Sequence, residues 1–314
     1  MSPELVLQQA LNGISFGALL FILAAGLSLI FGMMDVVNLA HGAFYMLGAY
    51  VALQVVQATG QFWAAVVIAP VVLGLVGLAI EPLLLRRLRG RHLEQVLLTI
   101  GVALVITDLI GLVWGREART LPFPPGFDRS IDIAGSAYPT YRLFVIAFAV
   151  VLAVVLYYLH RRTAIGALIR AGVDDAEMLA ALGVDTDRLF AVTFAVGAAL
   201  AGLAGVIAAP AFGVRPGMDV DALIFSLIVV VVGGLGTLGG ASVGAALVGP
   251  AETFGKVLVP QFALALIFAI MAVILLARPG NDLQPDAGLF ETAMSFDDIT
   301  PTDVPPQGGG GGGG

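Results

Sequence analysis

Long apolar runs follow one another along the chain from its first residues to about residue 277. Most are close to the roughly 20 residues that a helix needs to cross a bilayer, and they lack the alternation of membrane β-strands. Backbone groups in lipid must bond within their own segment, as they do in a helix. The pattern therefore predicts an all-α polytopic transmembrane helix bundle of about eight or nine spans, some broken or re-entrant. We expect these spans at 6–31, 36–57, 62–85, 95–114, 142–159, 189–210, 221–237, 239–256 and 261–277.

Glycines interrupt the apolar pattern between residues 221 and 256. This stretch is either two spans or one span followed by a re-entrant piece. Gly234–Gly239 also matches the G-x-G-x-x-G spacing of dinucleotide-binding loops, but that site needs a soluble strand–helix–strand context. Close helix contact or a helix break is the favoured role for such glycines, as for the pairs Gly13–Gly17 and Gly240–Gly244. The interrupting residues are Gly233, Gly234, Gly236, Gly239 and Gly240.

Composition strengthens the membrane interpretation. Hydrophobic residues make up 59% of the 314 residues and charged residues only 12%, whereas soluble domains are about 25% charged. The sequence contains no cysteine and only three scattered histidines, which excludes disulfide scaffolds and thiolate metal sites. It also lacks a Ser-His-Asp, HExxH or paired-carboxylate pattern. We therefore expect no catalytic residue, no cofactor and no metal, and a membrane-embedded enzyme is disfavoured.

Basic residues predict the orientation, because they are enriched in cytoplasmic loops. Clusters occur at 86–91 and 161–188. Placing both in the cytoplasm also places Arg278 there, which gives nine basic residues inside and five outside, with Lys256 ambiguous. The N-terminus is then outside and 115–141 is an ordered external loop. Residues 161–188 form a cytoplasmic loop with a short helix ended by Gly183.

The overall charge of −7 comes mainly from the C-terminal segment. Residues 279–314 hold six acids and no base, and they finish with seven glycines. We expect this tail to be disordered, so that residues 1–278 are the transmembrane domain. The rest of the chain is nearly neutral, with no basic face that would indicate a nucleic-acid partner.

Few charges lie in or near the predicted spans, and such residues usually face the bundle interior or an aqueous path. Glu81 is expected to be interfacial and Asp108 to be an interhelical hydrogen-bond partner. Asp35 lies between the first two spans, and capping at a helix break is favoured over ligand contact for both Asp35 and Asn38. His41 is expected to be a hydrogen-bonded packing residue. The charges are Asp35, Glu81, Asp108 and Glu252, too few for the acid network expected of an ion-coupled secondary carrier.

Three segments carry a family resemblance. They are GLSLIFG at Gly26–Gly32, NLAHGAFYMLGAY at Asn38–Tyr50 and GGLGTLGG at Gly233–Gly240. With the flanking residues from Leu5 to Ala52, they resemble the LIV-type branched-chain amino acid ABC transporter permeases, most closely the first, H-like, subunit. The resemblance extends over roughly Leu5 to Arg278.

The cytoplasmic loop carries a weaker match to the same family. Binding-protein-dependent permeases have a loop helix with the pattern E-A-A-x-x-x-G, which docks on the ATPase. Glu177 and Gly183 hold that spacing here, while Met178 and Leu179 replace the alanines. With Leu182, these two side chains offer an apolar knob for a groove on a partner. The alternative is an interfacial amphipathic helix.

The resemblance implies one permease subunit of an ABC importer, working by alternating access. Its partners would be a second, M-like permease, two ATP-binding subunits and an extracytoplasmic substrate-binding protein, with membrane lipid around them in a prokaryotic plasma membrane. The chain has no P-loop, so ATP hydrolysis belongs to the separate subunits. Urea or short amides are alternative substrates. Broken helices often lie at transporter binding sites, so the candidate pathway or hinge residues are Asp35, Asn38, His41, Gly42, Gly234, Gly236, Gly239 and Gly240.

Overall fold

Helices form at all nine predicted positions, with bounds close to those of the apolar runs. The computed structural model describes residues 3–35, 37–133 and 135–277, so the predicted tail lies outside the described residues. Residues 1–274 and 275–314 are separate units, and the contacts below belong to the first. The helices are α1 (Pro3–Met34), α2 (His41–Thr59), α3 (Phe62–Ile80), α4 (His92–Trp114), α5 (Thr140–Arg162), α6 (Ala164–Asp174), α7 (Ala176–Ala181), α8 (Thr186–Phe212), α9 (Met218–Gly233), α10 (Leu238–Leu258) and α11 (Ala263–Ala277).

The bundle is all-α, as expected. In the described residues, α1, α4, α5, α8 and the segment Phe62–Leu88 are long and apolar enough to cross a membrane. The glycine-interrupted stretch is the pair α9 and α10, which meet at a bend of 113°. The bend is compatible with a broken span or a re-entrant loop, and counting the pair as one span gives six. Helices α2 and α11 occupy the other two predicted positions.

Helices α1 and α8 form the centre of the bundle. The most apolar window of each is 72% buried, whereas the corresponding windows of α3, α4 and α5 are no more than 22% buried. Side chains such as Leu104 and Leu112 therefore remain exposed on the outer helices. In a membrane, lipid or another subunit covers such faces, so their exposure carries no hydrophobic cost.

Glycines set the close approach of α1 to α10. A Cβ atom on Gly13 would lie 2.6 Å from the Cα atom of Pro250, and one on Gly17 would lie 2.6 Å from the carbonyl oxygen of Ala245. Both distances are too short for a side chain. The close helix contact predicted for the Gly13–Gly17 pair is confirmed, because only glycine lets the two backbones touch.

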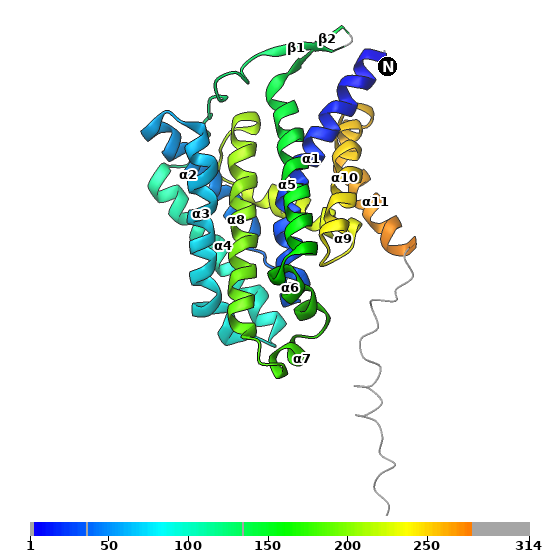
Figure 1. Ribbon diagram of the computed structural model, residues 1–314. Helices are drawn as coiled ribbons and strands as arrows, with labels where there is room; N and C mark the ends of the chain where they lie inside the picture. The colour runs from blue at the N-terminus through cyan, green and yellow to red at the C-terminus, as the bar shows by residue number, and fades with distance from the viewer. Residues whose placement is uncertain (1–2, 36, 134, 278–314) are drawn as a thin grey trace, which may run out of the picture. The chain divides into compact units, whose positions relative to one another are not determined.

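The two ends of the bundle differ (Figure 1). We call one the arginine end, because several arginines follow α3 there. They lie in and next to the turns Glu81–Leu85 (η1) and Arg86–Leu88 (η2), beside the start of α8. The other is the hairpin end, with strands β1 (Ser130–Ile133) and β2 (Ser136–Pro139). The sequence pattern did not predict this hairpin, whose antiparallel strands have only four residues each. The short turn Pro260–Phe262 (η3) precedes α11.

Candidate functional site

The loop 161–188 folds as two helices, α6 and α7, instead of the single short helix expected. Each helix from α6 to α8 begins at a side-chain cap. Thr163 Oγ1, Asp175 Oδ1 and Asp185 Oδ1 each accept a hydrogen bond from the backbone N–H three residues further on, at 3.1, 2.8 and 3.0 Å. These caps satisfy backbone donors that a helix start leaves unpaired. Extended backbone at Asp175 separates α6 from α7.

The predicted apolar knob divides into an outward and an inward part. Met178 and Leu182 are 58% and 74% exposed. Leu179 is not part of this surface, because it faces the bundle and is only 5% exposed. It belongs to a small buried cluster that joins α7 to the ends of α1 and α8. The members of that cluster are Met33, Leu179, Leu189 and Phe190.

Glu177 lies at the start of α7, and Gly183 follows its end. Glu177 is exposed in the first turn of α7, where a carboxylate interacts favourably with the helix dipole. Gly183 has φ of 85°, a conformation that favours glycine, and its N–H donates to the carbonyl of Ala180 at 2.9 Å. Glycine is therefore the favoured residue where α7 ends, and Leu182 before it is exposed.

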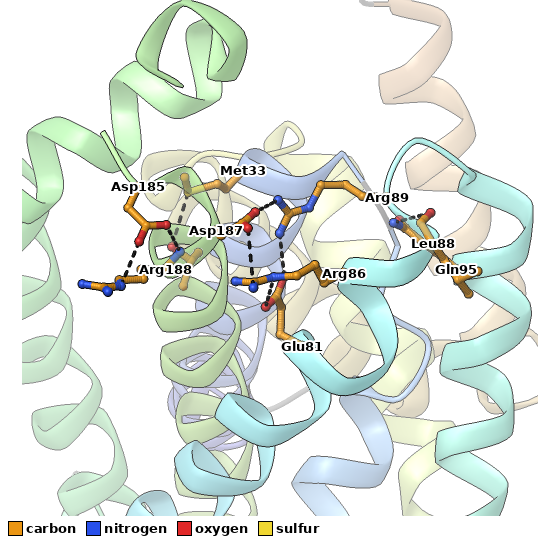
Figure 2. Close-up of polar contacts among 10 residues, drawn as sticks. Met33, Glu81, Arg86, Leu88, Arg89, Gln95, Asp185, Asp187 and Arg188 are labelled. Atoms are coloured by element: carbon orange, nitrogen blue, oxygen red, sulfur yellow. Dashed lines mark hydrogen bonds and ion pairs between the residues drawn. The ribbon is translucent and has the colours of Figure 1, made fainter. Parts of the chain in front are cut away.

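A network of four charges lies beside this loop (Figure 2). Glu81, with a side chain that is fully buried, accepts a hydrogen bond from Arg89 at 2.7 Å and lies 4.0 Å from Arg86. Both arginines also contact Asp187, in the first turn of α8; the Arg86–Asp187 distance is 3.5 Å. The two carboxylates and two guanidinium groups carry no net charge together. A buried carboxylate is stable only when a positive charge is paired with it. The network ties the turns after α3 to the start of α8.

The backbone around Glu81 departs from the α-helical pattern. Glu81–Leu85 is a π-helical turn and Arg86–Leu88 a 3₁₀ turn. Pro82 has no N–H to continue the helical ladder, and π turns often mark functional positions. Arg89 also stacks over the ring of Phe190 at 4.2 Å, a favourable cation–π contact. Glu81, which the sequence predicted to be interfacial, thus has a side chain enclosed by protein and paired with arginines.

The residues 37–42, which lead into α2, come back to the middle of α1. Asp35, with φ of 49°, is exposed. Asn38 is buried, and its Oδ1 accepts from the N–H of Ala40 at 3.1 Å. His41 is fully buried, with Nε2 2.9 Å from the carbonyl oxygen of Leu23. The second helix therefore begins beside the middle of α1, so that the break reaches into the bundle.

The glycines of the second break occupy different environments. Gly234 and Gly236 have φ of 109° and 76°, and a Cβ on Gly236 would lie 2.8 Å from the Cα of Gly32. Gly240 packs against Thr237 Oγ1, whereas Gly239 has open space around its missing Cβ.

The two breaks touch different parts of the bundle. Gly42 at the first break lies against the backbone of Asp219 at the start of α9. At the second break, Ser28 of α1 donates to the carbonyl of Thr237 at 2.9 Å. The candidate pathway residues thus form two groups along α1 and do not meet in one cluster.

Sequence reasoning missed the partners of Glu81 and the three helix caps. The caps had a local signal, since Thr or Asp precedes each helix. The contact between Arg89 and Asp187 had none, because 98 positions separate the two residues. Asp108, expected to bond between helices, is 80% exposed and lies 3.9 Å from Arg116. Among the described residues, no three histidine or acidic side chains gather where they could hold a metal ion.

The broken helices, the glycine-packed centre and the loop helices at one end describe a multi-pass membrane protein of the permease class. Over residues 9–275 the chain matches the family described as "Branched-chain amino acid transport system / permease component". The chain belongs to this family. The expected resemblance is confirmed, and members of this family are transport components and not enzymes.

Individual relatives are similar over most of their length. The high-affinity branched-chain amino acid transport system permease protein BraD of Pseudomonas aeruginosa is 30% identical, over 88% of this chain and 96% of its own. LivH of Escherichia coli K12 is 28% identical, over 87% of this chain and 94% of its own. LivM of the same organism, also named a permease of such a system, is 29% identical over 69% of this chain and 56% of its own. No solved structure matches the chain.

Proposed function

We propose that this chain is one permease subunit of an ATP-driven importer for branched-chain amino acids, and that it moves them by alternating access. The match to the permease family over residues 9–275 carries this proposal. A second, M-like permease completes the pathway. Two ATP-binding subunits supply the energy, and an extracytoplasmic binding protein delivers the substrate.

The arginine end is the cytoplasmic face in this proposal, in a prokaryotic plasma membrane. Arginine enrichment at that end supports the orientation. The loop 161–188 is then the coupling loop and 115–141 the external loop. Residues 1–278 form the permease domain, and 279–314 an acidic tail outside it.

The helix α7 is the proposed contact for the ATP-binding subunits. Met178 and Leu182 are exposed neighbours on one small surface, which suits an apolar groove on a partner. Glu177 and Gly183 hold the ends of the turn. Leu179 connects α7 to α1 and α8 through its buried cluster. A displacement of α7 is therefore transmitted to the two central helices.

The glycine breaks are the proposed hinges of the pathway. Helix breaks at 35–42 and 234–240 expose backbone groups that can meet a polar ligand. The bend of 113° between α9 and α10 supports a change of angle there. Movement of α1 affects both breaks, because His41 and Thr237 are each hydrogen-bonded to it.

Uptake of labelled leucine into vesicles tests the function. The chain is reconstituted with the second permease, the ATP-binding subunits and the binding protein from its gene neighbourhood. We expect uptake that requires ATP inside the compartment holding the ATP-binding subunits, and competition by isoleucine and valine. Competition by urea or acetamide, without competition by isoleucine and valine, would show instead that the importer carries urea or short amides. Uptake by this chain alone along an ion gradient would contradict the importer proposal.

A paired substitution tests the coupling surface. Met178→Asp with Leu182→Asp places two charges in the proposed contact, and we expect uptake to fall by about tenfold or more, because apolar anchors dominate such contacts. The control is Leu93→Asp on α4, an exposed apolar residue outside α7, which should leave the uptake rate unchanged. Equal rates for the double variant and the wild type would refute docking at α7.

A further inference from the structure

A cavity near the hairpin end has a lining that neither the coupling surface nor the glycine breaks explain. Its volume is about 490 Å³, and α1, α2, α9, α10 and the turn after α8 contribute to its wall. This volume lies in the range of small-molecule sites, on the order of 300–1,000 Å³. A smaller cavity of about 220 Å³ adjoins it, because both are lined by Phe16, Phe212, Glu252 and Lys256.

Two ion pairs line the larger cavity in a chain that has few charges. Arg215 donates to Asp221 at 2.6 Å, and both side chains are slightly more than half exposed. Lys256 lies 2.5 Å from Glu252, whose side chain is only 5% exposed. Charged residues within a membrane bundle usually line a path for a polar solute. The cavity thus presents both signs of charge with no net excess.

The remainder of the wall is mainly apolar. Leu20 and Leu23 of α1 contribute aliphatic surface, and Phe16 and Phe225 face one another edge to face at 5.4 Å. An aliphatic side chain placed against these residues would leave water on binding, which favours association. Acids and bases together with an apolar wall are the features needed to bind a zwitterion that has a hydrocarbon side chain.

We propose that this cavity is the binding site for the amino acid within the permease, an inference that rests on the proposed function. Arg215 binds the α-carboxylate, since a guanidinium has five N–H donors and only one is engaged by Asp221. Glu252 binds the α-ammonium group. The side chain of the substrate lies against Leu20, Leu23 and Phe225. A zwitterion keeps the site neutral, because each of its charges meets a protein charge of opposite sign.

The position of Arg215 suits delivery from the hairpin end. Val214, the preceding residue, forms a two-way backbone bridge with Arg119, and both N···O distances are 2.8 Å. The loop 115–141, proposed to face the binding protein, is therefore joined to the wall of the cavity. A substrate released above this loop would meet Arg215 before it reaches the middle of α1.

Direct binding to the purified complex, without the binding protein, tests the site. The probes are leucine, isopentylamine (leucine without its carboxyl group) and 4-methylpentanoate (leucine without its amino group). We expect Arg215→Gln to weaken leucine binding by about tenfold or more and to leave isopentylamine binding unchanged. Glu252→Gln should weaken leucine equally and leave 4-methylpentanoate unchanged. Hydrogen bonds to charged groups have strengths that correspond to such changes.

The reciprocal pattern separates ligand contact from a structural role. Loss of an ion pair that only holds the fold would weaken all three probes alike, and that result would overturn the proposal. Arg116→Gln is the matched control, because the Arg116–Asp108 pair is exposed and should leave all three affinities unchanged.

Uptake by the complete importer distinguishes the site from the function. ATP-dependent leucine uptake by a wild-type importer whose permease complex binds none of the probes would overturn the site and leave the function standing. Normal leucine uptake by both cavity variants would do the same. Absence of ATP-dependent leucine uptake by the wild type would overturn the proposed function, and this site with it.

Discussion

At the scale of single residues, a buried carboxylate gives the clearest dependence on one side chain. Glu81 is fully buried and contacts two arginines that are each about one third exposed. Its charge is needed because Asp187 alone would face both guanidinium groups. An amide at this position keeps the shape and one hydrogen bond, but it leaves an excess positive charge beside the bundle.

We therefore expect Glu81→Gln to lower the stability of the protein by about 2 kcal/mol, a value reduced from that of a fully buried pair because water partly screens the arginines. The measurement is the temperature at which the detergent-purified protein loses its monodisperse elution. Asp108→Asn is the matched control, an acid-to-amide change in a pair that is about 80% exposed, and should shift that temperature little. If Glu81→Gln lowers this temperature no more than Asp108→Asn does, the buried network adds no stability beyond that of an exposed ion pair.

At the scale of elements, the positions of the helices followed from the sequence, but the contacts between them did not. Apolar run length depends only on neighbours along the chain, and it predicted all nine positions in the bundle. The inward direction of Leu179 depends on Met33 and Phe190, which come from other helices. The partners of Glu81 likewise come together only when α3 and α8 pack. Long-range contacts of this kind leave no local pattern.

The sequence pattern did not distinguish the glycines of the second break from one another, although their surroundings in the structure differ. Adjacent residues Gly239 and Gly240 both belong to α10. A Cβ on Gly240 would lie 2.6 Å from Thr237 Oγ1 and 2.7 Å from the carbonyl oxygen of Gly233. A Cβ on Gly239 would meet nothing within 4 Å. The bend thus depends on one of these two glycines for close backbone contact.

This difference predicts opposite outcomes for two neighbouring substitutions. Gly240→Ala should lower stability by about 1–3 kcal/mol, because the added methyl group forces α9 and α10 apart. Gly239→Ala should be neutral or slightly stabilising, since alanine favours the helix over glycine. Thermal unfolding of the two purified variants, side by side with wild type, is the measurement. Similar destabilisation by both would mean that the bend is not set by this contact.

At the scale of the whole molecule, function depends on which end of the bundle faces the cytoplasm. The contact between Asp187 and Arg89 places the two arginine clusters at one end, so they report one orientation together. The sequence alone suggested this only by counting basic residues in separate loops. Physical proximity strengthens the argument, because both loops must now be on the same side of the membrane.

The absence of cysteine from the sequence makes this orientation directly testable. Single cysteines at Glu177 and Asp128, both exposed, report the arginine end and the loop 115–141. We expect Asp128→Cys to react with a membrane-impermeant maleimide in intact cells. Glu177→Cys should react only after the membrane is opened, because the arginine-rich loops remain in the cytoplasm.

The cysteine-free wild type is the background control, and leucine uptake by each variant shows that it is inserted in its working form. Labelling of Glu177→Cys from outside would place α7 on the side where no ATP is available. The coupling surface would then have no ATP-binding subunit to contact, and the cavity lined by Arg215 would lie toward the cytoplasm. This one result would therefore remove both the direction of transport and the delivery route to the cavity, whereas the fold would stand unchanged.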